Sequence, residues 1–93
     1  MVVQSAPADC SAVRKVSGAA SYLAALGQAV RRQRERLGKS QEQFAFDVGL
    51  DRTYVSGIER GVRNPTVATL LRLTAVLGIL PSALLRAAER AEK

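Results

Sequence analysis

The chain has 93 residues, enough for one small domain, and its 47% hydrophobic and 24% charged residues are typical of a chain that folds. Fourteen Lys and Arg against eight Asp and Glu give a formal net charge of +6, which favours a polyanionic partner, either nucleic acid or an anionic membrane surface. With no His and one Cys, the composition excludes a His-based catalytic triad, an internal disulfide and a Cys/His zinc site.

Residues 1–21 are predicted to form a flexible N-terminal arm with some helix near its end, because they are rich in Ser, Ala and Gly and show poor periodicity. The arm is either a disordered tail or a segment that contacts DNA or a partner through Arg14 and Lys15. Cys10 is expected to be a free thiol, with an intermolecular disulfide as the alternative. The N-terminus does not resemble a signal peptide, and no apolar run approaches about 20 residues. We therefore expect a cytoplasmic protein.

Residues 22–93 are predicted to fold as an all-α, compact five-helix bundle. The first helix is expected over residues 22–37, ended by Gly38, and its apolar residues recur at helical spacing: Leu23, Leu26, Val30 and Leu37. A second helix follows Ser40, which with Gln43 predicts a capping box, and it runs to Val48. Its expected core residues are Phe44, Ala45 and Val48.

Three further helices are predicted from turn and capping residues. The third follows the cap Asp51 and reaches Arg60, the fourth covers residues 67–77, and the fifth runs from Pro81 towards Glu92. The fourth helix is expected to bury apolar residues at helical spacing: Val67, Leu70, Leu71 and Leu77.

The second and third helices, joined by a tight turn, predict a helix-turn-helix unit over residues 41–60. Ala45 is small where the two helices would cross, and Gly49 supplies the positive φ of a sharp turn at little cost. On a helical wheel of the third helix, Val55 and Ile58 point inward. The opposite, outward face has no large apolar residue and carries Arg52, Thr53, Ser56, Gly57 and Arg60.

Gly57 is unusual on this outward face, since glycine in a helix interior costs roughly 1 kcal/mol. A glycine is expected where the backbone must come close to another molecule, although tolerated drift gives the same sequence.

The run SQEQFAFDVGLDRTYVSGIERG, Ser40–Gly61, closely resembles the helix-turn-helix of lambda repressor and Cro-like regulators, and the resemblance extends over about residues 26–85. Within that family the segment LDRTYVSGIERG is most similar to controller proteins of restriction-modification systems, although stand-alone regulators share similar segments. The resemblance implies that the third helix enters the DNA major groove.

The resemblance also implies roles for individual residues. Base contacts are expected from Arg52, Thr53, Ser56 and Gly57, with Arg52 suited to bidentate bonding to guanine. Phosphate contacts are expected from Gln41, Tyr54, Arg60, Arg63 and Asn64. The alternatives are a solvated or phosphate-bound Arg52, and turn chemistry before Pro65 for Arg63 and Asn64.

Two further expectations concern structure and assembly. By resemblance, Arg34 pairs with Glu59 beneath the third helix in a structural ion pair that does not contact DNA. The fifth helix is the expected dimer interface, through a leucine and small-residue stripe of Leu80, Leu84, Ala88 and Ala91; the alternative is that the whole stripe packs within one chain.

The sequence as a whole predicts a sequence-specific, double-stranded-DNA-binding transcriptional regulator, acting as a homodimer on a pseudo-palindromic operator, with restriction-modification genes as the finer expectation. A protein-interaction module, such as an antitoxin that uses residues 1–21 or the fifth helix on a protein partner, is the second hypothesis. A membrane-surface peptide is disfavoured because the cations of the first helix cluster at one end: Arg31, Arg32, Arg34 and Arg36. No cofactor, metal or enzymatic activity is expected, because no paired carboxylates, ligand cluster or phosphate-binding glycine loop is present.

Overall fold

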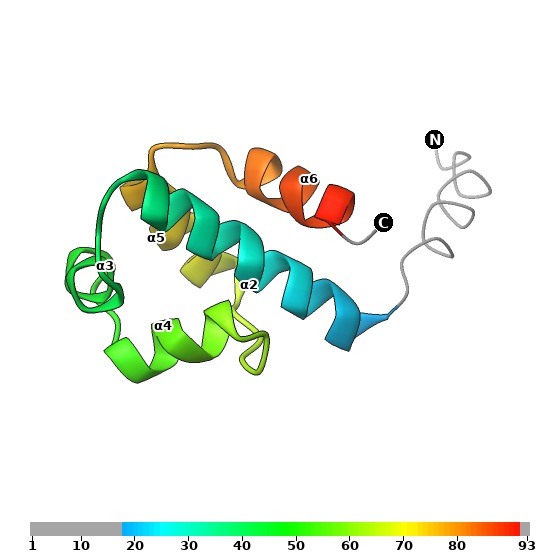
Figure 1. The fold of residues 1–93 in the computed structure, drawn as a ribbon, viewed down its shortest axis with the longest axis horizontal. Coiled ribbons are helices and arrows are strands. Elements are labelled where there is room, and N and C mark those ends of the chain that lie inside the picture. Colours follow the sequence, from blue (N-terminus) through cyan, green and yellow to red (C-terminus); the bar gives the residue numbers. More distant parts are fainter. Residues whose placement is uncertain (1–17, 92–93) are drawn as a thin grey trace.

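The computed structural model describes residues 18–91, and this range contains five α-helices and no strand. The helices are α2 (Ala19–Arg36), α3 (Gln41–Val48), α4 (Arg52–Glu59), α5 (Val67–Leu77) and α6 (Pro81–Ala91). The long helix α2 crosses the molecule, with α4 packed on one side of it and α6 on the other (Figure 1). The all-α, five-helix prediction is therefore confirmed.

The first described helix begins earlier than predicted. Tyr22 donates its backbone N–H to the carbonyl of Gly18 at 3.0 Å, and α2 starts at Ala19 within the segment expected to be an arm. Helix near the end of residues 1–21 was expected, and the alanines there favour it although they show no amphipathic periodicity. The Tyr22 hydroxyl also donates to the carbonyl oxygen of Leu85 on α6, at 3.2 Å. The expectations for Cys10, Arg14 and Lys15 lie outside the described residues.

The core lies between α2 and the four shorter helices. Its largest fully buried side chains come from every helix: Phe44, Ile58, Leu73, Leu84, Val30 and Val55. The predicted burial of Phe44, Ala45 and Val48 on α3, and the inward direction of Val55 and Ile58 on α4, are confirmed.

The predicted inward face of α5 is partly wrong. Val67 and Leu71 are 71% and 53% exposed, whereas Leu73 and Thr74 are buried. The Thr74 hydroxyl is satisfied by donating to the backbone carbonyl of Leu70 at 3.0 Å. The apolar side chains of α5 point to most sides of the helix. Their spacing alone therefore did not identify the face that meets the core.

Two residues of the predicted dimer stripe belong to the core of the single chain. Leu84 and Ala88 are 1% and 0% exposed, because α6 packs this face against α2. Their assignment to a dimer interface is wrong. Leu80, at 70% exposure, and Ala91 remain on the surface.

The ends of α3 carry the local signals expected there, with one correction. The Ser40 hydroxyl accepts a hydrogen bond from the Gln43 backbone N–H at 3.0 Å. The side chain of Gln43 does not return to Ser40 and instead donates to Asp47 at 3.1 Å. The predicted capping box is therefore only half formed, because the bond to Asp47 holds the Gln43 side chain one turn further along α3, away from the Ser40 backbone N–H that its oxygen would accept from.

The turn between α3 and α4 is held from a distant helix. Gly49 has φ of 84°, which glycine adopts without the strain of a side chain. Arg72 of α5 donates from Nη2 to the carbonyl oxygens of Val48 and Gly49, at 3.0 and 2.9 Å. These carbonyls lie at the end of α3, where no helical N–H is available to them, so Arg72 ties the turn to α5.

Helix α4 packs very close to α2 at Gly27. A Cβ atom on Gly27 would lie 2.3 Å from the carbonyl oxygen of Ile58 and 2.5 Å from that of Glu59. Because both neighbours are backbone atoms, they cannot move aside without moving α4. The hydrogen side chain of Gly27 therefore sets the distance between the two helices.

We expect Gly27→Ala to lower the free energy of unfolding by about 1–3 kcal/mol because of this overlap. Helix propensity alone predicts the opposite sign, a gain of about 1 kcal/mol. Urea unfolding would measure the difference, with Gln28→Ala on the exposed neighbouring position as the control. A Gly27→Ala protein at least as stable as the wild type would contradict the close packing.

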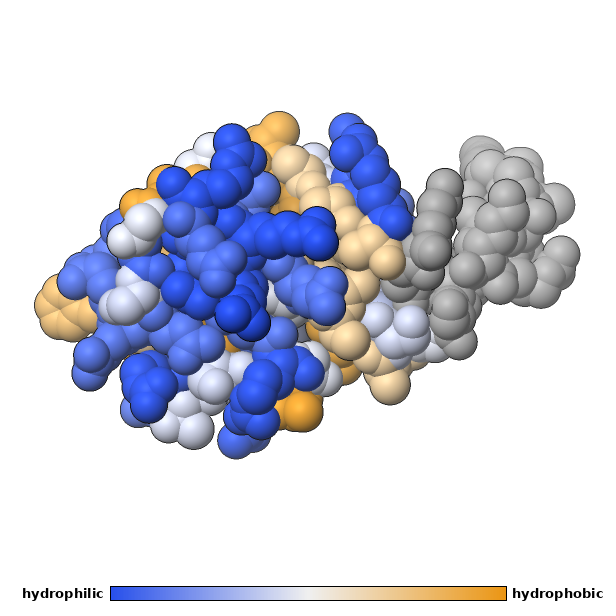
Figure 2. Space-filling model, viewed as in Figure 1, coloured by the Kyte–Doolittle hydropathy of each residue, from blue (hydrophilic) through white to orange (hydrophobic). Residues whose placement is uncertain are grey.

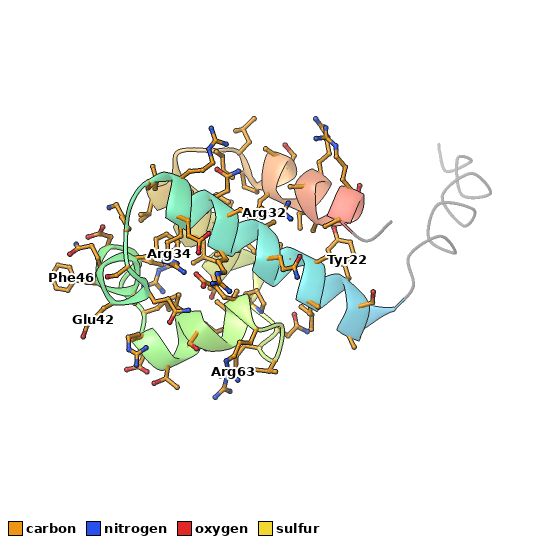
Figure 3. All side chains as sticks on the ribbon, in the orientation of Figure 1. Tyr22, Arg32, Arg34, Glu42, Phe46 and Arg63 are labelled. Carbon is orange, nitrogen blue, oxygen red and sulfur yellow. The ribbon has the colours of Figure 1, made fainter. Side chains whose placement is uncertain are left out.

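A buried ion pair joins α2 to the end of α4. Arg34, labelled in Figure 3, donates from Nε to Glu59 Oε2 at 2.7 Å and from Nη2 to Glu59 Oε1 at 3.0 Å. The two side chains are only 10% and 3% exposed. The hydrogen bond to Glu59 raises the pKa of Arg34 above its usual value, so the guanidinium stays charged. The expected pair is thus present beneath α4.

We expect Arg34→Met to lower the free energy of unfolding by about 3–5 kcal/mol, because it keeps most of the stem but leaves the Glu59 charge buried without its partner. Arg31→Met is the matched control, since Arg31 pairs with Glu35 at side-chain exposures of 63% and 53%. Losing that exposed pair costs less than about 1 kcal/mol. Equal losses in urea unfolding would show that the buried pair has no special structural role.

Candidate nucleic-acid interface

The candidate interface is the outward face of α4. Val55 and Ile58 anchor the helix in the core, and the Asp51 carboxylate accepts a hydrogen bond from the Thr53 backbone N–H at 3.0 Å. This cap satisfies one N–H that the first turn of a helix leaves unpaired. The opposite face of α4 is thereby held at the molecular surface, along the lower edge of the view in Figure 1.

Arg52 and Thr53 stand exposed at the N-terminal end of α4. In the part of the chain that the structure describes, neither side chain makes a hydrogen bond or an ion pair. Ser56 is half-buried one turn later and accepts a hydrogen bond from Nε of Arg60 at 3.3 Å. The first turn therefore offers free donors, whereas Ser56 is already engaged within the chain.

Gly57 does not present open backbone as predicted. It is buried, and a Cβ atom there would lie 2.4 Å from Cγ of Arg63. The group that approaches Gly57 closely is thus the side chain of Arg63, from the loop after α4. The expectation that Gly57 leaves room for DNA is wrong in this structure, because Arg63 occupies that space.

Arg63 extends the interface beyond α4. Its guanidinium carbon lies 5.9 Å from the ring centroid of Tyr54, within the range of a cation–π contact. Arg63 and Asn64 are both exposed, and Pro65 behind them is buried. The loop therefore packs against the body through Pro65 and leaves its polar side chains at the surface.

Gln41, at the start of α3, is hydrogen-bonded to the buried ion pair of Arg34 and Glu59. Its side-chain amide donates to Glu59 Oε1 at 2.9 Å, and this half-buried bond turns the amide towards the protein. Arg34 meanwhile donates from Nη1 to the backbone carbonyl of Lys39 at 2.8 Å. Contact between Gln41 and a phosphate remains a prediction, and it would require the amide to share or leave Glu59.

The candidate interface carries arginines that are not paired with a carboxylate, as do α2, α5 and α6 elsewhere in the described residues. Lys39 is hydrogen-bonded to Asp47, which lowers the pKa of that carboxyl group, and Arg31 pairs with Glu35, so these cations are neutralised. The arginines at and after α4 form no ion pair in the described residues: Arg52, Arg60 and Arg63. The surface over α3 and α4, at the left of the view in Figure 2, is mainly hydrophilic.

Three features of this region were not predicted from the sequence. Arg72 holds the turn before α4, Arg63 covers Gly57, and Phe46 on α3 is 81% exposed beside Glu42 (Figure 3). Local periodicity carries no signal for the first two, because each joins residues of different elements. For Phe46, helical spacing from the buried Phe44 already places it off the core face.

The described residues contain neither a candidate metal-binding group nor a single helix that could span a membrane. Between residues 18 and 91 no group of three or more His, Cys, Asp or Glu side chains could hold a metal ion. No single helix in that range is long and apolar enough to cross a membrane. Helices α5 and α6 meet the length and composition requirement only as a pair bent by 99°.

Comparison with known proteins identifies the same motif. The helix-turn-helix family (HTH_3) matches residues 30–84. Control protein C.BamHI of Bacillus amyloliquefaciens is 43% identical over 60 residues, covering 63% of this chain and 74% of that protein. Control protein C.MunI of a Mycoplasma species is 46% identical over 52 residues, covering 56% and 70%.

A solved structure extends the likeness to the fold. The restriction-modification controller protein C.AhdI from Aeromonas hydrophila has 47% sequence identity and a TM-score of 0.65, over 67% of this chain and 94% of that one. The matched region contains α3, the turn and α4, where the exposed polar face lies. The chain therefore belongs to the lambda repressor/Cro-like helix-turn-helix family and is a DNA-binding transcriptional regulator, not an enzyme.

Proposed function

We propose that the chain is a cytoplasmic controller protein that binds a pseudo-palindromic operator as a homodimer and regulates restriction-modification genes. The observation that carries the proposal is the exposed first turn of α4, where Arg52 and Thr53 have no partner within the described chain. The controller role is supported by the three relatives described above, all of which are named control or controller proteins.

The roles of the interface residues follow from their positions. Arg52 and Thr53 are proposed to contact base edges directly, with Ser56 one turn further along the same face. Phosphate contacts are proposed for the residues that surround this centre: Gln41, Tyr54, Arg60, Arg63 and Asn64. The ion pair of Arg34 and Glu59 is excluded from this set because it is buried.

Dimerisation is proposed to use a surface that keeps Leu80 of the expected stripe and replaces its buried residues with exposed ones on α5. Val67 and Leu71 are four residues apart on α5 and share an exposed face, which Ala75 continues. Leu80, three residues after α5, is 70% exposed. We propose that Val67, Leu71 and Leu80 meet a second copy of the chain, because one α4 reads one half-site and two-fold pairing doubles the contact with DNA.

We expect Arg52→Ala to weaken binding to a duplex selected from a random-sequence library by about 1–3 kcal/mol, while binding to random duplex changes much less. Titrations at fixed salt would measure both affinities. Arg86→Ala is the charge-matched control, because Arg86 is exposed on α6, on the opposite side of α2 from α4. Equal losses on the two duplexes would assign Arg52 to phosphate, and a wild-type protein without any preference would refute operator binding.

We expect Leu71→Glu and Leu80→Glu to dissociate the dimer, because each places a carboxylate in an apolar contact. Sedimentation equilibrium would give the mass of each variant, with unfolding measured in parallel. Leu37→Glu is the control, since Leu37 is also an exposed leucine but follows α2. A monomeric wild-type protein, or two variants that dimerise as tightly as the wild type, would rule out this surface.

A further inference from the structure

Gly57 is a buried glycine in the middle of the exposed face of α4. Its backbone is helical with negative φ, so an L side chain would not be strained there. The space that a Cβ would need is taken by Arg63, whose Cγ and Cβ would lie 2.4 and 3.5 Å away. Glycine at this position therefore makes room for the stem of one particular arginine.

The loop after α4 is folded so that Arg63 returns along the helix. Gly61 has φ of 78°, which reverses the chain. The backbone N–H groups of Val62 and Arg63 both donate to the carbonyl oxygen of Gly57, at 2.9 and 3.2 Å. Gly57 thus holds the loop through its backbone and receives the Arg63 stem at its α-carbon.

The end of Arg63 is also placed. The guanidinium of Arg63, which Figure 3 labels, lies 5.9 Å from the ring centroid of Tyr54, one turn towards the start of α4. It remains exposed and forms no ion pair within the described residues. A guanidinium held in this way loses less conformational entropy when it binds an acceptor than one on a free stem.

We propose that Gly57 is a positioning residue for DNA binding: it does not contact the duplex, but its missing side chain seats Arg63 on α4, between Gly57 and Tyr54, with the guanidinium turned to an acceptor of the DNA. This inference rests on the proposed use of the α4 face for DNA. It gives Arg63 a fixed position on the outward face of α4. The sequence analysis had expected Gly57 itself to contact DNA there.

Gly57→Ala provides a test in which folding and binding change in opposite directions. We expect its thermal midpoint to equal or exceed that of the wild type, because alanine favours a helix and the displaced atoms belong to a side chain that can swing out. We expect its affinity for the selected duplex to fall by about three- to tenfold, as in Arg63→Ala, the size of one lost hydrogen bond.

The double variant Gly57→Ala/Arg63→Ala is the matched control. Once Arg63 is removed, the glycine has nothing to seat, so the double variant should bind as Arg63→Ala does, without a further loss. Additive losses would overturn the proposal, as would wild-type affinity in Gly57→Ala or in Arg63→Ala. If Gly57→Ala does not fold, the double variant must fold, because the clash between the alanine Cβ and the Arg63 side chain is gone. If neither variant folds, the proposed packing of Arg63 on Gly57 is refuted.

The outcomes also separate this inference from the proposed function. A wild-type protein that prefers no duplex sequence would refute operator recognition. A wild-type protein that binds a selected duplex, together with a Gly57→Ala protein that binds it equally well, would refute only the role of Gly57.

Discussion

The hydrogen-bonded ion pair of Arg34 and Glu59 is the contact on which the arrangement of the candidate interface depends. The pair joins α2 to Glu59, the last residue of α4. The Glu59 carboxylate also accepts a hydrogen bond from Gln41 at the start of α3. Arg34 reaches the Lys39 carbonyl in the intervening loop as well. Because charges buried this deeply are tolerated only when paired, the three helices have one mutual position in which all these groups are satisfied.

Close backbone packing supports the same position from the apolar side. Gly27 allows α4 to approach α2 until their backbones touch, and Arg72 holds the turn before α4 from α5. Helix α4 has eight residues and would not be stable alone, since short isolated helices are marginal in water. The polar face of α4 is therefore positioned almost entirely by contacts made from the opposite side of the helix. The side chains of Arg52 and Thr53 make no hydrogen bond or ion pair within the described residues.

The candidate interface also includes a residue that is not part of α4. Arg63 comes from the following loop and lies over Gly57 towards Tyr54, so two segments present polar groups on one side of the molecule.

On α5, Val67 and Leu71 leave apolar area uncovered, in a chain whose small size limits the stability of its core. Pairing of two chains there would cover that area and present two copies of α4 to one duplex.

Local signals in the sequence determined the helices, most of their ends and the inward residues of α3 and α4, because capping, glycine turns and helical periodicity act within a few residues. They did not determine which side of the almost wholly apolar α5 is buried, nor that Leu84 and Ala88 of α6 face α2. Those choices, and the seating of Arg63 on Gly57, join residues of different elements, so only the packing of the whole chain decides them.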